Sequence, residues 1–139
     1  MAAALLHRFQ PRGRAKQLME CRDPEVLVAG PAGTGKSRAC LEKLHTMALL
    51  NNDMRGLIVR KTLASLGSSA LVTWREHVIK ESLAAGDVVF FGGSPQDAPT
   101  YRYRNGSVVG VAGMDRSTRV MSSEYDIVYV QEATELTEN

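Results

Sequence analysis

The segment Gly30 to Ser37, GPAGTGKS, constrains the fold of this chain more than any other feature of its sequence. It lies between a short apolar run at residues 25–29, EVLVA, and a helix-forming run, SRACLEKLHTMALL. Side chains at Gly33 and Gly35 would obstruct a backbone that turns its N–H groups inward around an anion. A strand, a glycine loop and a helix in this order predict a phosphate-binding loop.

The loop fits the pattern G-x-x-x-x-G-K-[ST]. The positive end of the following helix dipole would face the anion. Lys36 would reach the β- and γ-phosphates, and the Ser37 hydroxyl would ligate Mg²⁺. The absence of an Asn-Lys-x-Asp guanine-reading motif favours ATP, and the alternative is a glycine-rich turn without a ligand. The nucleotide-binding candidates are Gly30, Pro31, Ala32, Gly33, Thr34, Gly35, Lys36, Ser37 and Arg38, and Lys36 is also a catalytic candidate.

A second apolar run, IVYVQEA at residues 127–133, ends in polar residues that hydrolysis would need. Glu132 is the candidate catalytic base, because its carboxylate could accept a proton from an attacking water. Gln131 stands where Asp is usual, and a neutral amide is a poor magnesium-organising group. The alternative is that Glu132 is a solvated helix-start residue together with Glu135. The candidate metal ligands are Ser37, Gln131 and Glu132, with Asp126 or another acid as a helper.

Strand and helix patterns alternate along the rest of the chain. This alternation predicts an α/β fold with a mostly parallel central sheet flanked by helices, and with the loop it predicts a P-loop NTPase of the ASCE type. An antiparallel hairpin is expected around Asn105-Gly106. Gly67 weakens the longest predicted helix. Helices are predicted over 13–21, 37–50 and 62–78, and strands over 25–29, 56–60, 87–93 and 127–133.

The length of 139 residues suits one domain, and 44% hydrophobic residues can form a core. A net charge of +2 neither proves nor excludes a nucleic-acid partner. Cys21 and Cys40 have no metal-like spacing, which indicates reduced thiols. No stretch is long and apolar enough to cross a membrane. We therefore expect a cytoplasmic protein without a membrane partner.

Four segments resemble the ATPase part of the large terminase subunit of tailed bacteriophages, in the form found in actinobacterial phages. They are PEVLVAGPAGTGKSRACLEKL, GLIVRKTLASLGSSALVTW, NGSVVGVAGMD and RVMSSEYDIVYVQEATELTE. The resemblance implies a motor that uses ATP and Mg²⁺ to pump double-stranded DNA into empty capsids, gripping DNA without reading its sequence. It also implies a homo-oligomeric ring, a portal protein and a small terminase subunit as partners, in the cytoplasm of the infected bacterial cell.

The resemblance also implies roles for residues outside the loop. Gln17 is the candidate adenine reader and Gln10 the second choice, although Gln17 is equally consistent with an ordinary exposed helix residue. The segment Arg60-Lys61-Thr62 resembles one that senses nucleotide or touches DNA, and strand-end solvation is the alternative. The candidates for an arginine finger are Arg38, Arg102, Arg104, Arg116 and Arg119, with a preference for Arg116 and Arg119.

The chain departs from the family beyond its second motif. Large terminases continue into a coupling motif, another sheet strand and a nuclease domain, whereas this sequence stops at Asn139. We therefore expect an ATPase domain over residues 1–139, apparently truncated after the second (Walker B) motif, with no nuclease domain and with an exposed sheet edge. Two other functions stay open: a helicase-like P-loop ATPase that acts on DNA, and an ATP-binding fragment without turnover.

Overall fold

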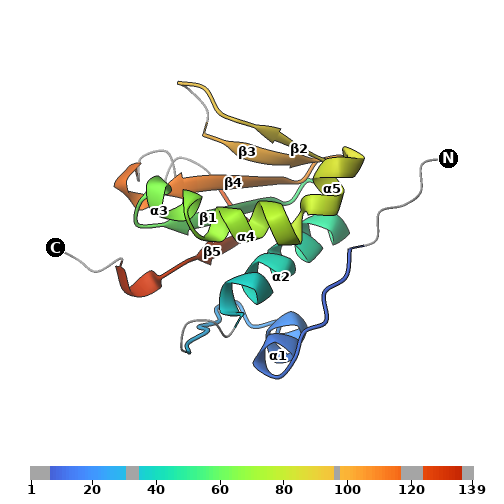
Figure 1. Cartoon of the computed structure of the whole chain (residues 1–139), viewed down its shortest axis with the longest axis vertical. Helices are drawn as coiled ribbons and strands as arrows, with labels where there is room; N and C mark the ends of the chain where they lie inside the picture. The colour runs from blue at the N-terminus through green and yellow to red at the C-terminus, as the bar shows by residue number, and fades with distance from the viewer. Residues whose placement is uncertain (1–6, 31–34, 96–97, 117–123, 136–139) are drawn as a thin grey trace.

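The computed structural model describes residues 7–30, 35–95, 98–116 and 124–135, which form one five-stranded sheet and a set of helices (Figure 1). The strand order is β2-β3-β4-β1-β5, with β4, β1 and β5 parallel and with β2, β3 and β4 antiparallel. The α/β class with a mostly parallel core and an antiparallel hairpin is confirmed. The strands are β1 (Arg55–Arg60), β2 (Val88–Phe91), β3 (Thr100–Tyr103), β4 (Val108–Gly113) and β5 (Ile127–Val130).

The predicted helices over 13–21 and 37–50 are present, and the predicted helix over 62–78 is broken into shorter pieces. Its first piece ends at Gly67, as the helix-weakening glycine predicts. No helix in the described ranges is long and apolar enough to span a bilayer. The helices are α1 (Arg14–Glu20), α2 (Lys36–Leu50), α3 (Leu63–Gly67), α4 (Ala70–Thr73), α5 (Lys80–Ala85), the π-helical η1 (Trp74–Val78), and the 3₁₀ turns η2 (Met114–Arg116) and η3 (Ala133–Glu135).

The helices that contact the sheet pack against one of its faces (Figure 1). Side chains alternate along a strand, so Ile58 faces the core that contains Leu44 and Trp74, while its neighbours Leu57 and Val59 form a smaller cluster on the other face. Because β4, β1 and β5 are parallel, their carboxyl ends meet at one edge of the sheet, where ligand sites of α/β folds form.

The turn Asn105-Gly106 joins β3 to β4, as the sequence predicts. Gly106 has φ 90°, in the left-handed region, and a Cβ at this position would lie 2.0 Å from Asp53 Oδ1. Asn105 donates its side-chain amide to the Ala48 carbonyl oxygen over 2.8 Å, which ties the hairpin to the end of α2. Only glycine therefore fits this turn.

The predicted strand over residues 25–29 is wrong, because this segment has no regular secondary structure. Val26 is 47% exposed and Leu27 is 84% exposed. Among the described residues, β5 pairs only with β1, so no described strand extends the sheet beyond β5. An apolar, β-branched sequence suits a strand, but a strand forms only where a neighbour accepts its hydrogen bonds.

Candidate functional site

The first turn of α2 is the part of the predicted site that the structure describes most fully. Gly35 precedes the helix in the left-handed conformation, with φ 78° and ψ 17°. No described side chain caps this end, and the first turn contains no acidic residue. Lys36 and Arg38 place cations there instead, although cations are unfavourable at a helix N-terminus. The amides of this turn therefore suit an external anion.

The two ends of the glycine loop are held together by Lys36, whose Nζ donates a hydrogen bond to the carbonyl oxygen of Gly30. The structure thus brings Gly30, Gly35, Lys36 and Ser37 to one place. The other four predicted loop residues, Pro31, Ala32, Gly33 and Thr34, lie outside the described residues.

The Ser37 hydroxyl faces β5, where the Tyr129 hydroxyl donates to Ser37 Oγ over 3.5 Å. Burial raises the pKa of Tyr129, and the hydrogen bond with Ser37 acts in the opposite direction. The negative charge of Glu132 adds to the rise. The Ser37 hydroxyl therefore lies beside β5, the strand that leads to Glu132.

Glu132 follows β5 after one intervening residue, Gln131, at the carboxyl edge of the parallel strands, and is exposed. Its φ of 52° lies in the left-handed region, which costs a residue with a side chain about 1 kcal/mol or more. The preceding residue is fixed, because Gln131 N donates to the Val59 carbonyl oxygen over 2.9 Å. Asp126 lies at the other end of β5, where its carboxylate accepts from Arg55 N over 2.8 Å, so it is not close to Glu132.

The Gln131 side chain is only 6% exposed and is engaged within the protein. Its Oε1 lies 3.1 Å from Ser69 Oγ, which donates to it. Ser69 Oγ also accepts from the Arg60 guanidinium over 3.0 Å and donates to the Ser65 carbonyl oxygen over 2.6 Å, so its single hydrogen is shared between this oxygen and Gln131 Oε1. The amide of Gln131 therefore ties the end of β5 to the segment between α3 and α4.

The fit of Mg²⁺ to the three metal candidates follows from these contacts. The described residues contain no group of three or more His, Cys, Asp or Glu side chains that could hold a metal. Mg²⁺ is commonly held by one or two protein oxygens, phosphate oxygens and waters. Ser37 Oγ and the exposed Glu132 carboxylate suit this scheme, whereas Gln131 already serves Ser69.

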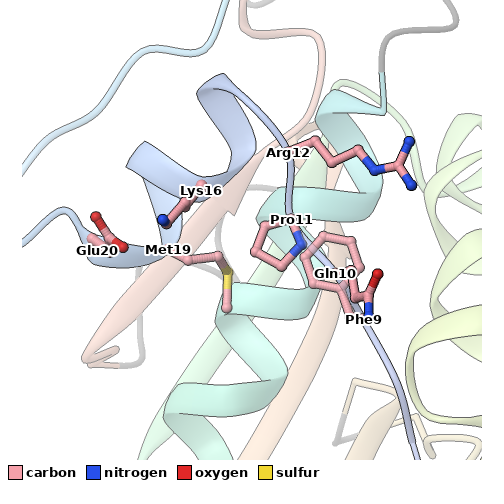
Figure 2. Close-up of a pocket in the computed structure, with 7 residues that line it drawn as sticks. All are labelled: Phe9, Gln10, Pro11, Arg12, Lys16, Met19 and Glu20. Atoms are coloured by element: carbon pink, nitrogen blue, oxygen red, sulfur yellow. The ribbon is translucent and has the colours of Figure 1, made fainter.

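A pocket of about 470 Å³ lies between the N-terminal segment and α1 (Figure 2). In the figure, Met19 extends from α1 toward Pro11, and Arg12 points away. Gln10 lines this pocket, whereas Gln17 is exposed on α1 and does not. The lining residues are Phe9, Gln10, Pro11, Arg12, Lys16, Met19 and Glu20.

Arg38 connects this pocket with the start of α2. Its guanidinium carbon lies 5.4 Å from the ring centroid of Phe9, and its Nε donates to Glu42 Oε1 over 2.9 Å. Such a cation–π contact holds an aromatic ring in place. Phe9 and the adjacent Gln10 are therefore attached to the same helical turn that follows the loop.

The other predicted basic residues serve local structure where they are described. Arg60 donates to the carbonyl oxygen of Ser65 over 3.3 Å, and the Thr62 side chain caps α3 by accepting from Ser65 N. Arg102 lies over the Phe91 ring, with 4.3 Å to the centroid, and Arg104 pairs with Asp87 at 3.4 Å. Arg119 and the side chain of Arg116 lie outside the described part of the chain.

A larger cavity of about 1190 Å³ adjoins the pocket beside α1, with which it shares Met19 and Glu20, and extends along the segment after α1, the second half of α2 and the beginning of β5. Its lining includes Met47, Leu50 and Ile127, and of the predicted nucleotide and metal candidates it includes only the possible helper Asp126. The loop and metal candidates Lys36, Ser37 and Glu132 do not line this cavity.

Sequence reasoning missed three residues of this region: Phe9, Ser69 and Tyr129. Tyr129 sits inside an apolar run and Ser69 inside a helical pattern, and neither position carries a sequence signal of its own. Comparison of the chain with protein-family models and with curated proteins gave no match. The function must therefore be inferred from the loop motif and the geometry around it.

Proposed function

We propose that this chain is a P-loop NTPase domain that binds ATP with Mg²⁺ and hydrolyses its γ-phosphate. One observation carries the proposal: no described side chain caps the start of α2, which begins at the cationic Lys36, with Arg38 in its first turn, inside a G-x-x-x-x-G-K-S loop. A polyphosphate would satisfy the amides of this turn and the two cations together.

Three side chains of the chain have distinct roles in this proposal. Lys36 exchanges its contact with the Gly30 carbonyl oxygen for phosphate oxygens. The Ser37 hydroxyl and Glu132 are the residues that would hold Mg²⁺, which when bound neutralises charge on the phosphates. Glu132 also orients the attacking water and accepts its proton, and its exposed position leaves room for that water.

The base of the nucleotide fits the pocket that Figure 2 shows. A carboxamide both donates and accepts hydrogen bonds, as the edge of adenine requires. Gln10 lines this pocket and Gln17 does not, so we propose Gln10 as the adenine reader. Phe9, held by Arg38, offers an aromatic wall beside it.

The use of the hydrolysis energy is proposed from the resemblance to large terminases. The chain would power translocation of double-stranded viral DNA into procapsids, with Lys and Arg side chains gripping DNA phosphates. A homo-oligomeric ring, a portal protein and a small terminase subunit are the corresponding partners. An arginine from a neighbouring subunit would stabilise charge on the transferring phosphoryl group.

Nucleotide binding without turnover is a second candidate function. The observation that favours it is the hydrogen bond between Gln131 and Ser69, because this bond keeps the Gln131 side chain from helping to hold Mg²⁺. Glu132 would then have to hold the metal and activate the water by itself. A helicase-like ATPase would share the same site.

Calorimetric titration with Mg-ATP tests the binding step. Lys36→Ala should abolish binding, because it removes the charge that reaches the phosphates, whereas Lys80→Ala, a change of an exposed lysine on α5, should leave the affinity unchanged. Equal affinities of Lys36→Ala and the unaltered chain would refute the proposed site.

A further inference from the structure

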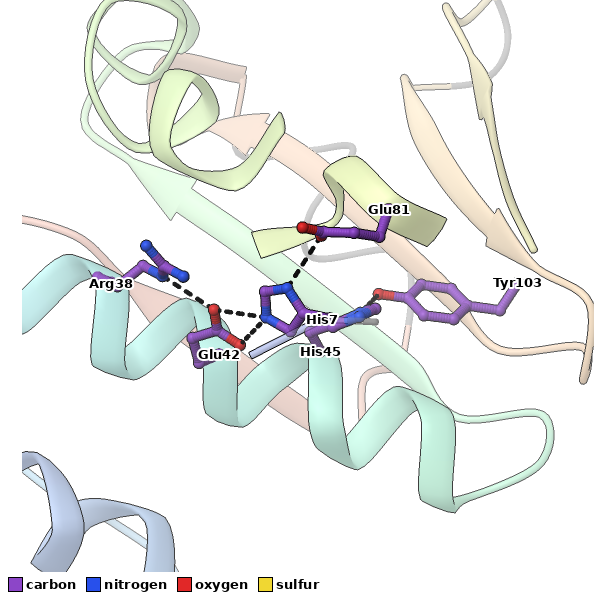
Figure 3. Close-up of polar contacts among 6 residues, drawn as sticks. All are labelled: His7, Arg38, Glu42, His45, Glu81 and Tyr103. Carbon is purple, nitrogen blue, oxygen red and sulfur yellow. Dashed lines mark hydrogen bonds and ion pairs between the residues drawn. The ribbon is translucent and has the colours of Figure 1, made fainter. Parts of the chain in front are cut away.

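The N-terminal segment is fastened to two helices by His7 (Figure 3). The ring nitrogen Nδ1 lies 2.9 Å from Glu81 Oε2 on α5. The other nitrogen, Nε2, lies 2.8 Å from both carboxylate oxygens of Glu42 on α2. These partners are 74 and 35 residues away in sequence, so the contacts hold the segment against the folded core.

Both contacts of His7 require a donor on the ring. An ionised carboxylate only accepts hydrogen bonds, and a neutral imidazole donates from one nitrogen alone. While both carboxylates are ionised, both bonds therefore form together only when His7 is an imidazolium. Charge balance agrees, because Glu42 and Glu81 carry two negative charges, and Arg38, paired with Glu42, supplies one positive charge. The second positive charge comes from His7.

The balance of charges matters most at Glu42, because this residue is only 2% exposed. A buried carboxylate is costly unless it is paired and hydrogen-bonded. Glu42 meets both conditions through His7 and Arg38. If His7 lost its second ring proton, one of its two carboxylate contacts would lose its donor.

The neighbouring histidine of α2 does not share this charge. His45 is 2% exposed, and burial, helped by the nearby charge of His7 and opposed by that of Glu81, lowers its pKa to about 4. Its Nδ1 is hydrogen-bonded to the Tyr103 hydroxyl of β3 over 2.7 Å, and burial raises the pKa of Tyr103.

The carboxylate of α5 completes the surroundings of His7. Burial works to raise the pKa of Glu81, but its own backbone hydrogen bond, the bond and charge of His7 and the charge of Lys80 together lower it. Glu81 therefore stays ionised while His7 is charged. The titratable and charged groups around the His7 ring are Arg38, Glu42 and His45 on α2 and Lys80 and Glu81 on α5, with Tyr103 on β3 behind His45.

We propose that His7 is a proton-dependent latch, which holds residues 7–12 against α2 and α5 as an imidazolium and releases them when it loses its second ring proton. Phe9 and Gln10 lie within this segment and line the pocket beside α1. Opening of the latch therefore dismantles that pocket, and its effect on adenine binding, unlike the latch itself, rests on the proposed function.

NMR of the whole chain without nucleotide tests the latch. Imidazole ¹⁵N shifts report the protonation of each of the three histidines, and backbone order parameters report how firmly Arg8 to Arg12 are held. We expect order parameters near about 0.85 at a pH where His7 is charged and both carboxylates are ionised, and below about 0.6 at higher pH, with the same midpoint as the titration of His7. A segment that stays ordered after His7 has lost its proton would overturn the latch.

Two variants and a control sharpen this experiment. Glu81→Gln supplies an amide that donates to a neutral ring nitrogen, so the segment should stay ordered through the whole titration. His7→Gln should leave the segment disordered at both the lowest and the highest pH of the titration. His77→Gln, a change of an exposed histidine of η1, should behave like the unaltered chain. Unaltered pH dependence in Glu81→Gln would contradict the donor argument. Since no nucleotide is present, failure of ATP binding would leave this result intact.

Discussion

Tyr129 and Ser37 meet where β5 reaches the first turn of α2, with 3.5 Å between their hydroxyl oxygens. Hydrogen bonds between hydroxyl groups usually span about 2.7 to 2.8 Å, so this one is weak. The serine that the loop motif assigns to Mg²⁺ thus has a partner that holds it loosely, as a side chain that exchanges ligands requires.

Substitutions at these two hydroxyl groups should have different effects. Tyr129→Phe should change the free energy of unfolding by less than about 1 kcal/mol, since it removes a weak bond, and should keep ATP binding. Ser37→Ala should remove the strengthening of ATP binding by Mg²⁺. Calorimetric titrations with and without Mg²⁺ measure both effects. Loss of the Mg²⁺ effect in Tyr129→Phe alone would show that the tyrosine, and not the serine, serves the metal.

The two glutamines upstream of the loop give a second prediction. Gln10→Ala should weaken ATP binding by roughly tenfold, because about one hydrogen bond to the base is lost. Gln17→Ala should have no effect, since Gln17, unlike Gln10, which is also exposed, lies outside the pocket lining. The affinities of the two variants for a labelled ATP, measured by fluorescence, decide between the two glutamines. Weaker binding by Gln17→Ala than by Gln10→Ala would restore Gln17 as the adenine reader.

The buried amide of Gln131 predicts a stability effect. Ser69→Ala should destabilise the fold by about 1 to 3 kcal/mol, because it leaves the Gln131 amide without its partner. Ser68→Ala is the matched control, since Ser68 is exposed and only donates to the Ser65 carbonyl oxygen over 3.3 Å. Urea denaturation measures both variants. Equal stabilities would mean that the contact between Ser69 and Gln131 contributes nothing.

His45 predicts that the fold weakens in acid. Its pKa is about 4 in the folded chain against 6.5 ordinarily, so the unfolded chain binds the proton more readily. Its contribution to stability is complete above pH 6.5 and is lost as the pH falls toward 4, by about 3 kcal/mol in all. Urea unfolding between pH 7 and 4 should show this slope, and His45→Phe should reduce it. An unchanged slope in that variant would assign the acid sensitivity to other groups.

Local signals in the sequence were enough to predict most of the helices, strands and turns. The hairpin at Asn105-Gly106 and the end of α3 at Gly67 follow from residues that determine backbone conformation by themselves. Residues 25–29 have an equally good strand sequence and form no strand. Pairing depends on a neighbour that lies far away in sequence, and the pattern of one segment cannot report it.

In the candidate site, too, a local motif predicts some residues, whereas others depend on partners that are distant in sequence. The loop motif predicts the roles of Lys36 and Ser37, because the spacing itself carries the chemistry, and these roles stay predictions. The role of Gln131 was not predictable, since Ser69 lies 62 residues away from it. The pairing of His7 with Glu42 and Glu81 was likewise invisible, because it joins three distant segments.

Phosphate release from ATP by the Glu132→Gln variant tests the central claim most directly. The variant keeps the size and the exposed position of the side chain but removes the base, so it should still bind Mg-ATP and should hydrolyse it at least about 100-fold more slowly than the unaltered chain. Glu76→Gln, a change of an exposed glutamate on η1, should release phosphate at the unaltered rate. Hydrolysis by Glu132→Gln at that same rate would contradict the assignment of Glu132 as the catalytic base.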